Sequence, residues 1–145
     1  MTALATFKAD LAAYVAASGG GGGGYTSGPW TPADASGAGL TFSNVSAYYV
    51  QTAGMVFAFF YLSYPANSSS AAIKIGGLPA TVSNNNYSLK PEFIDIHYAG
   101  ANPMFFARPN KNDTSFVIIN NGTGANPTNA GLNGITISGC LMYPV

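Results

Sequence analysis

The stretch MVFAFFYL, residues 55–62, decides the expected fold class. In an extended strand, successive side chains point to opposite faces of the sheet. One face then carries Met55, Phe57, Phe59 and Tyr61, and the other carries Val56, Ala58, Phe60 and Leu62. Neither face is polar, whereas an antiparallel sheet in a monomer usually exposes one face to water. We expect one face to enter the core and the Met55 face to contact a neighbouring subunit, with burial under a long loop of the same chain as the alternative.

Seven further segments have strand-like composition, and turn-rich sequences separate them. With residues 55–64, the expected strands are 40–43, 47–51, 72–75, 92–98, 103–107, 115–119 and 134–143. Short strands with loops between them, and no helix after residue 18, predict an all-β antiparallel β-sandwich or jelly roll over residues 28–145.

The last expected strand contains the only cysteine, Cys140. Alternation places Ile135, Ile137, Gly139, Leu141 and Tyr143 on one face and Thr136, Ser138, Cys140 and Met142 on the other. A single cysteine excludes an internal disulfide. We interpret Cys140 as a small buried apolar residue rather than a nucleophile.

The N-terminal residues predict a short helix on a flexible tether. Leu4, Phe7, Leu11 and Tyr14 recur at 3-4-3 spacing, and six consecutive glycines follow at residues 19–24. A helix of this length is marginal alone in water, so its apolar stripe needs a partner. The glycines can span about 20 Å. We therefore divide the chain into an arm (1–18), a linker (19–27) and a body (28–145). Two alternatives for the arm are a bundle with the arms of two other copies and packing on its own body.

Charge is scarce: five Lys and Arg balance five Asp and Glu, and only 7% of residues are charged. No basic stripe is available for phosphates, which argues against nucleic-acid binding. The longest apolar run ends after eight residues, too short to span a membrane, and the N-terminus does not resemble a signal peptide. Because so few residues are charged, we expect other chains to cover much of the surface.

Few residues could carry chemistry. Asp95 and the only histidine, His97, share a strand face by i, i+2 spacing, while Glu92 falls on the other face. A metal site would need at least one further ligand, which copies of the pair could supply around a trimer axis, but a surface or interface pair is the favoured interpretation. The chain has no nucleophile elbow, and its acids are scattered. We expect no enzymatic activity, no metal and no cofactor.

Four motifs occur in a familiar order: GPWTP (28–32), FSNVSAYYVQTAGMVFAFFYLSY (42–64), AAIKIGGLPATVS (71–83) and ITISGCLMYPV (135–145). This order resembles the jelly-roll domain of bacteriophage tail-fibre tips and of head decoration or fibre proteins. In that family Gly-Leu-Pro, here Gly77, Leu78 and Pro79, ends a strand at a tight turn. Such domains are usually trimeric, and the resemblance implies the same here.

The resemblance implies a homotrimeric capsid decoration (cement) protein, made in the host cytoplasm and placed on the exterior of the virion capsid. The implied capsid-binding arm carries Leu4, Phe7, Leu11 and Tyr14, and its partner is the major capsid protein. The implied subunit interface is Met55, Phe57, Phe59 and Tyr61.

The alternative is a receptor-binding fibre or spike tip that recognises a host surface glycan. Tyr87 or Tyr98, beside the amides of the SNNN segment at 83–86, could then stack on a sugar. We expect Trp30, the best stacking residue, to be packed instead. Copy number and location on the virion would separate the two functions.

Overall fold

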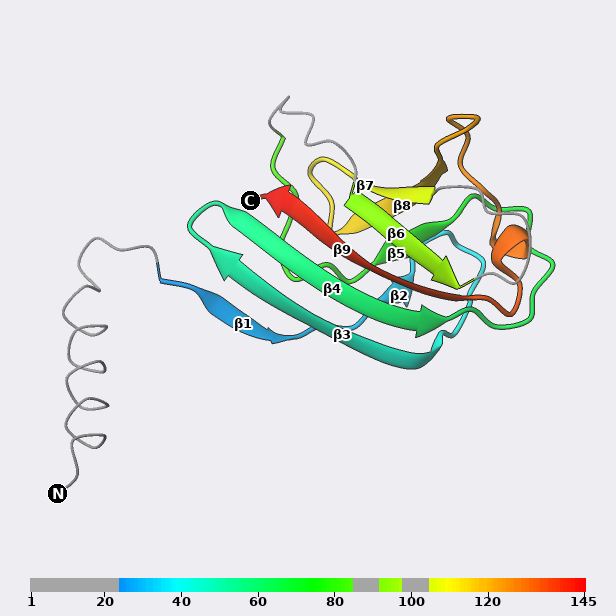
Figure 1. The fold of residues 1–145 in the computed structure, drawn as a ribbon, viewed down its shortest axis with the longest axis horizontal. Coiled ribbons are helices and arrows are strands. Elements are labelled where there is room, and N and C mark those ends of the chain that lie inside the picture. Colours follow the sequence, from blue (N-terminus) through cyan, green and yellow to red (C-terminus); the bar gives the residue numbers. More distant parts are fainter. Residues whose placement is uncertain (1–23, 85–91, 98–104) are drawn as a thin grey trace, which may run out of the picture.

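A computed structural model describes residues 24–84, 92–97 and 105–145, with residues 92–97 described by their backbone. Within these ranges the regular secondary structure is almost entirely β-strand (Figure 1). The strands are β1 Thr26–Pro29, β2 Ala33–Asp34, β3 Ser43–Thr52, β4 Met55–Ser63, β5 Lys74–Gly76, β6 Glu92–His97, β7 Phe105–Pro109, β8 Ser115–Asn120 and β9 Thr136–Pro144. One 3-10 turn, η2 (Asn129–Leu132), precedes β9.

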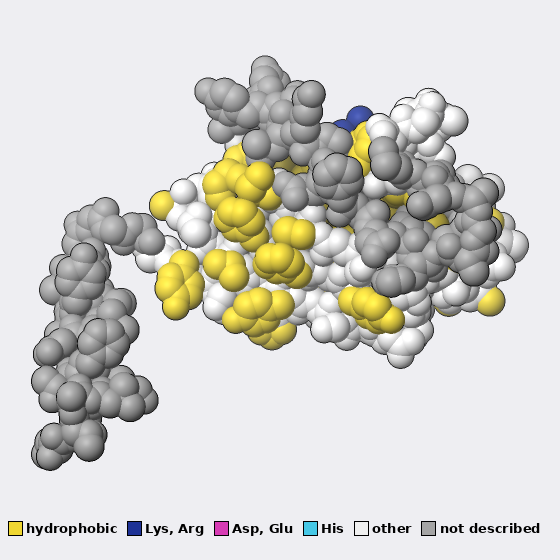
Figure 2. Space-filling model, in the orientation of Figure 1, with side chains coloured by type: hydrophobic (Ala, Val, Ile, Leu, Met, Phe, Trp, Pro, Cys, Tyr) yellow, Lys and Arg dark blue, Asp and Glu magenta, His cyan; other side chains and the backbone are white. Residues whose placement is uncertain are grey.

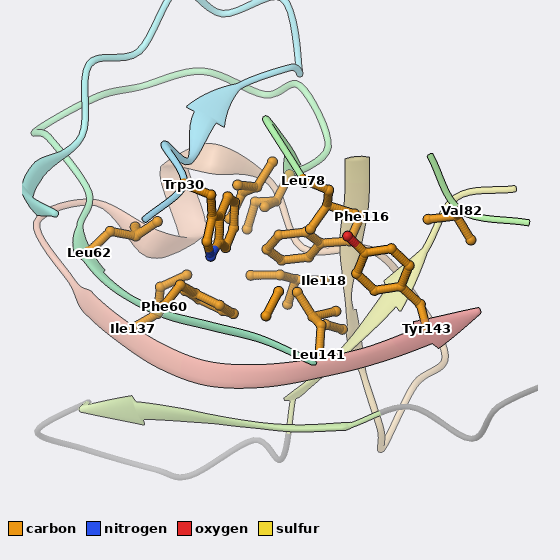
Figure 3. Packing of buried hydrophobic residues seen from close by; sticks show 14 of the residues in the cluster. Trp30, Phe60, Leu62, Leu78, Val82, Phe116, Ile118, Ile137, Leu141 and Tyr143 are labelled. Atoms are coloured by element: carbon orange, nitrogen blue, oxygen red, sulfur yellow. The ribbon is translucent and has the colours of Figure 1, made fainter. Parts of the chain in front are cut away.

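The strands form one antiparallel ladder in the order β1-β3-β4-β9-β6-β7-β8-β5-β2. The ladder folds over on itself, so that β8 packs across the core from β4, with the rings of Phe60 and Phe116 5.4 Å apart (Figures 1 and 3). The result is an all-β antiparallel sandwich, which confirms the predicted fold class at that level.

The core lies between the two layers and is built from alternate residues of the strands (Figure 3). On β4 the inward set is Val56, Ala58, Phe60 and Leu62, and on β9 it is Ile137, Leu141 and Tyr143. These inward faces are the ones predicted from the alternation of side chains along each strand. Ile73, Ile75, Phe116 and Ile118 fill the space from the opposite side.

Gly77 marks the end of β5, where the Gly-Leu-Pro motif predicted a tight turn. The strand stops at Gly76, and Gly77 adopts a φ of +85°. A Cβ at this position would collide with the carbonyl oxygen of Thr31. Only glycine lets the two backbone segments approach this closely. The chain continues directly into Leu78, which is buried and donates its backbone N–H to the carbonyl oxygen of Thr114 over 3.0 Å.

The structure also corrects several predicted boundaries. Residues 40–42 are not a strand, because Asp34 holds this segment in a loop: its Oδ2 accepts the backbone N–H of Leu40 over 3.1 Å. Strands β1 and β2 were not predicted. Since β1 starts at Thr26, the sheet begins two residues before the predicted body.

The predicted arm and most of the linker, residues 1–23, lie outside the described residues, so the helix and its tether stay predictions. Among the residues that the structure describes, no helix has the length and apolar character needed to cross a membrane.

Candidate subunit-contact surface

The outward side of β3, β4 and β9 carries an apolar surface that we call the outer patch. It consists of Tyr48, Val50, Met55, Phe57, Phe59, Tyr61, Cys140 and Met142. The contrast along β4 is sharp: Phe59 is 47% and Tyr61 42% exposed, whereas Phe60 between them is 4% exposed. All four residues predicted as a subunit interface therefore lie at the surface of this chain, on the face opposite the core.

Strand register assembles the outer patch from segments far apart in the sequence. Phe59 lies opposite Tyr48 of β3 on one side and Cys140 of β9 on the other. In the next row, Phe57 lies between Val50 and Met142. Residues directly opposite in neighbouring strands share a face of the sheet. With strands about 4.8 Å apart and a rise of about 3.3 Å per residue, the patch measures roughly 10 Å by 20 Å.

The outer patch is electrically neutral. None of β1, β3, β4 and β9 contains Asp, Glu, Lys, Arg or His. Figure 2 shows hydrophobic side chains gathered over this face, in contrast to the white, polar surface around them. Any partner bound here would gain from apolar burial, at about 25 cal/mol per Å² before ordering costs, and not from ion pairs.

Hydrogen-bonded polar side chains limit one end of the patch. At the Ser63 end of β4, the Ser63 and Thr136 hydroxyl oxygens are 2.8 Å apart, and the Asn44 side-chain amide donates to the Ser63 hydroxyl over 3.3 Å. At the other end, β4 begins with Met55 after the turn at Gly54. The patch is more apolar toward the β3–β4 turn, where Phe57 is flanked by apolar residues, than toward Ser63, where Tyr61 lies between Ser46 and Ser138.

Cys140 was predicted to be buried, and this is wrong. The residue is half-buried and lies on the outward side of β9, because alternation directs its neighbour Leu141 into the core. Its Sγ lies 3.9 Å from the carbonyl oxygen of Leu141. The thiol is therefore part of the outer patch.

Trp30, the best candidate for stacking on a sugar, is packed as predicted. Its side chain is 8% exposed, and its ring meets Phe60 edge-on with centroids 6.4 Å apart. The indole Nε1–H donates to the carbonyl oxygen of Phe59 over 3.0 Å. Tyr87 and Tyr98, the other stacking candidates, lie outside the described residues.

The three titratable residues of β6 are placed by register alone, and Glu92 lies opposite Ala107 of β7. Asp95 lies opposite Ser138, and His97 lies opposite Thr136. Their side chains, with the arm residues Leu4, Phe7, Leu11 and Tyr14, fall outside the described part of the chain. Within the described part, no group of three or more His, Cys, Asp and Glu could hold a metal ion.

A partly buried polar cluster, not expected from the sequence, lies away from the outer patch. Asp34 Oδ1 accepts the Ser36 hydroxyl over 2.6 Å, and the Ser36 oxygen accepts the Asn129 amide over 2.8 Å. Burial alone would raise the pKa of Asp34, but hydrogen bonds from Ser36, Leu40 and Gly39 outweigh it and hold the pKa below its ordinary value. These bonds fix the loop between β2 and β3.

One ion pair occurs among the described residues, and its strand, β5, is far from the outer patch in the strand order. Lys74 Nζ of β5 is 2.9 Å from Asp113 Oδ2. Hydrogen bonds from Lys74 and Ser115 lower the pKa of Asp113. Both side chains are more than a third exposed, so solvent screening makes this pair a weak contributor to stability.

No protein-family model, curated protein or solved structure matches the chain. The functional conclusion therefore depends on the geometry of the outer patch and on the order of sequence motifs. The geometry supports association through an apolar sheet face, and the part of the chain that the structure describes contains no cluster of His, Cys, Asp and Glu able to hold a metal ion.

Proposed function

We propose that the chain is a structural virion protein, a homotrimer that decorates and stabilises a bacteriophage capsid. One observation carries the association: Phe59 and Tyr61 are 47% and 42% exposed on a face where β1, β3, β4 and β9 contain no charged residue. Large exposed apolar patches typically mark protein–protein contact sites. Copies that meet through the outer patch would remove it from water.

The phage assignment and the jelly-roll topology depend on evidence other than the outer patch. They rest on the order of the four sequence motifs, from GPWTP at 28–32 to ITISGCLMYPV at 135–145. In the proposed mode of action, the trimer body lies on the shell and the tethered arm binds the major capsid protein. Linking two weak contacts in one chain raises their combined affinity, because the second contact forms at high effective concentration.

Two adjacent phenylalanines on opposite faces of β4 give a matched test of association. Phe59→Asp places a charge in the outer patch, whereas Phe60→Asp places it in the core. At high protein concentration, we expect the wild-type chain to sediment as a trimer and Phe59→Asp to give a folded monomer. Phe60→Asp should unfold, because an unpaired buried charge is costly. A Phe59→Asp protein that is still trimeric would place the subunit contact elsewhere.

Shell binding is tested separately, with purified capsids lacking the protein. We expect hundreds of copies per particle, and an affinity that changes little with salt, because apolar burial is not screened. Deleting residues 1–18 should lower occupancy. A few dozen copies at a tail or fibre position, together with binding to a glycan array, would support the receptor-binding alternative instead.

A further inference from the structure

We infer that, in the free monomer, the chain's own N-terminal arm (residues 2–18) covers the outer patch. The patch is apolar and exposed, and the sequence predicts that the arm carries an apolar stripe that needs a partner. The inference goes beyond the proposed shell binding and does not depend on it, because it concerns the protein before assembly. Assembly would then require the arm to leave the patch, so that one segment controls both contacts.

The chain enters the body beside the most apolar end of the patch. Thr26, the first residue of β1, pairs with Gln51 near the end of β3, next to the turn that leads to Met55. Tyr25 before it is exposed. β1 lies two strands from β4, which is about 10 Å. The six glycines at 19–24 can span about 20 Å, so the arm can reach the patch of its own subunit.

The arm and the patch match in size. Seventeen helical residues, 2–18, would form a rod about 25 Å long and 10 Å wide. The outer patch, from Met55 to Tyr61 along β4 and from β3 to β9 across it, measures roughly 20 Å by 10 Å. One helix laid along β4 would therefore cover the patch without extending far over the polar surface beyond Ser63.

The arm and the patch also match in charge. The stripe Leu4, Phe7, Leu11 and Tyr14 contains no charged residue, and neither do strands β1, β3, β4 and β9. The acidic residues of β6 lie beyond β9, outside the patch. On a helix at about 100° per residue, Lys8 and Asp10 fall on either side of the stripe, roughly 80° from its centre. Both charges can therefore stay in water while the stripe is buried.

The tether favours the arm over a second copy as the occupant in dilute solution. A short flexible linker holds a segment at an effective concentration on the order of millimolar. At micromolar protein concentration, a second copy is present at far lower concentration than the chain's own arm. Self-association then replaces the arm only where copies are concentrated, in concentrated solution or on a shell.

The native cysteine gives a direct test. Cys140 lies in the middle of the patch, opposite Phe59, and is the only cysteine of the chain. Leu11→Cys adds a thiol to the stripe. The matched control Ala9→Cys adds one about 160° around the helix, at nearly the same distance along the chain. A disulfide forms only where two Cα atoms come within about 7 Å.

We expect Leu11→Cys, oxidised at low micromolar concentration, to form a disulfide within one chain about tenfold faster than Ala9→Cys. Non-reducing electrophoresis and intact mass would identify this product as a monomer. Equal rates for the two variants would show only random collisions of a free arm and would overturn the inference. Covalent dimers in place of monomers would assign the patch to a second copy.

A second measurement guards against a cysteine variant that disturbs docking. Phe7→Asp with Leu11→Asp places charges on the stripe, and Ala5→Asp with Ala9→Asp places the same charges on the opposite side of the predicted helix. We expect the first full-length variant to bind the dye ANS several-fold more strongly than wild type, because the patch is uncovered, and the second to match wild type. Equal dye binding by the two variants would overturn the inference, whatever the outcome of the trimer and capsid experiments.

Discussion

The indole N–H of Trp30 donates a hydrogen bond to the backbone carbonyl oxygen of Phe59 over 3.0 Å, across 29 residues of sequence. The backbone N–H of Trp30 donates to the carbonyl oxygen of Ala47 over 3.3 Å. Trp30 thus ties the segment after β1 to both strands that carry most of the outer patch. The residue that fixes the entry of the chain also supports the patch from behind.

This relationship predicts a graded loss of stability. Trp30→Phe keeps an aromatic ring but removes the donor, and should cost about 1 kcal/mol for the hydrogen bond plus a small packing loss. Trp30→Ala also creates a cavity beside Phe60 and should cost about 3–5 kcal/mol. Urea unfolding measures both, with the exposed Tyr25→Ala as a control expected to stay within about 0.5 kcal/mol of wild type. Equal, small losses for both Trp30 variants would contradict the structural role.

A second prediction concerns Gly77. Gly77→Ala puts a Cβ against the carbonyl oxygen of Thr31, at a φ of +85° that already disfavours alanine. We expect a loss of more than about 3 kcal/mol, because the obstructing atom is backbone and cannot rotate away. Gly124→Ala is the matched control: its φ is +69°, but nothing lies within 4 Å of the added Cβ. Its cost should be about 1 kcal/mol. Similar losses at the two sites would show that the collision at Gly77 is relieved.

The strands that sequence patterns predicted correctly are the long, regular ones. In β4 and β9, apolar residues at every second position mark the core face, and Phe60 and Leu141 are buried as expected. β2 has two residues, too few to show any period, and exists because Asp34 pairs with Ile75 of β5. Such a strand is defined by its partner, so local sequence could not predict it.

The candidate site was predictable only along one strand. The odd-numbered residues of β4 suggested an exposed apolar face, but the neighbours of Phe59 depend on register with β3 and β9, more than 80 residues apart in sequence. The cluster of Asp34, Ser36 and Asn129 was not predictable either. Asn129 donates to Ser36 across 93 residues, and no local pattern signals such a bond.

A third prediction concerns the hydroxyl of Tyr64. This atom is buried and has no hydrogen-bond partner among the described residues. Burial and the nearby Asp34 charge raise its pKa well above the ordinary value, so the group stays neutral. An unsatisfied buried hydroxyl costs about 1–3 kcal/mol, so Tyr64→Phe should stabilise the protein by about 1 kcal/mol.

The control for Tyr64 is Tyr48→Phe. The Tyr48 hydroxyl is exposed and donates to the Ser27 hydroxyl over 3.0 Å, so its removal should change stability by less than about 0.5 kcal/mol. Thermal unfolding of the two variants, compared with wild type, measures the difference. A clear loss of stability in Tyr64→Phe would show that the hydroxyl has a hydrogen-bond partner after all.

The fourth prediction is a pH dependence set by Asp34. Its carboxylate accepts the Ser36 backbone N–H over 2.9 Å and the Leu40 backbone N–H over 3.1 Å, besides the Ser36 hydroxyl. The pKa of Asp34 is lowered in the folded protein, relative to an ordinary value of 3.8. A carboxylate with a lowered pKa stabilises the folded state fully above its unfolded pKa, and this contribution is lost as pH falls through the folded pKa.

Stability should therefore be level between about pH 5 and pH 7 and should fall below about pH 4, where the unfolded chain binds protons more readily than the folded one. Asp34→Asn keeps a side chain of similar size but has no charge to lose. Its free energy of unfolding should be lower than wild type at pH 7, and the two values should converge as pH falls toward 2.

Asp113→Asn is the comparison. The pKa of Asp113 is also lowered, but solvent screens its contact with Lys74. The free energies of unfolding of Asp113→Asn and wild type should therefore already lie close together at pH 7. If the Asp34→Asn and wild-type curves ran parallel over the whole acid range, the hydrogen bonds to Asp34 would contribute no pH-dependent stability, and the loop between β2 and β3 would have to be held by its apolar contacts through Leu40 and Phe42.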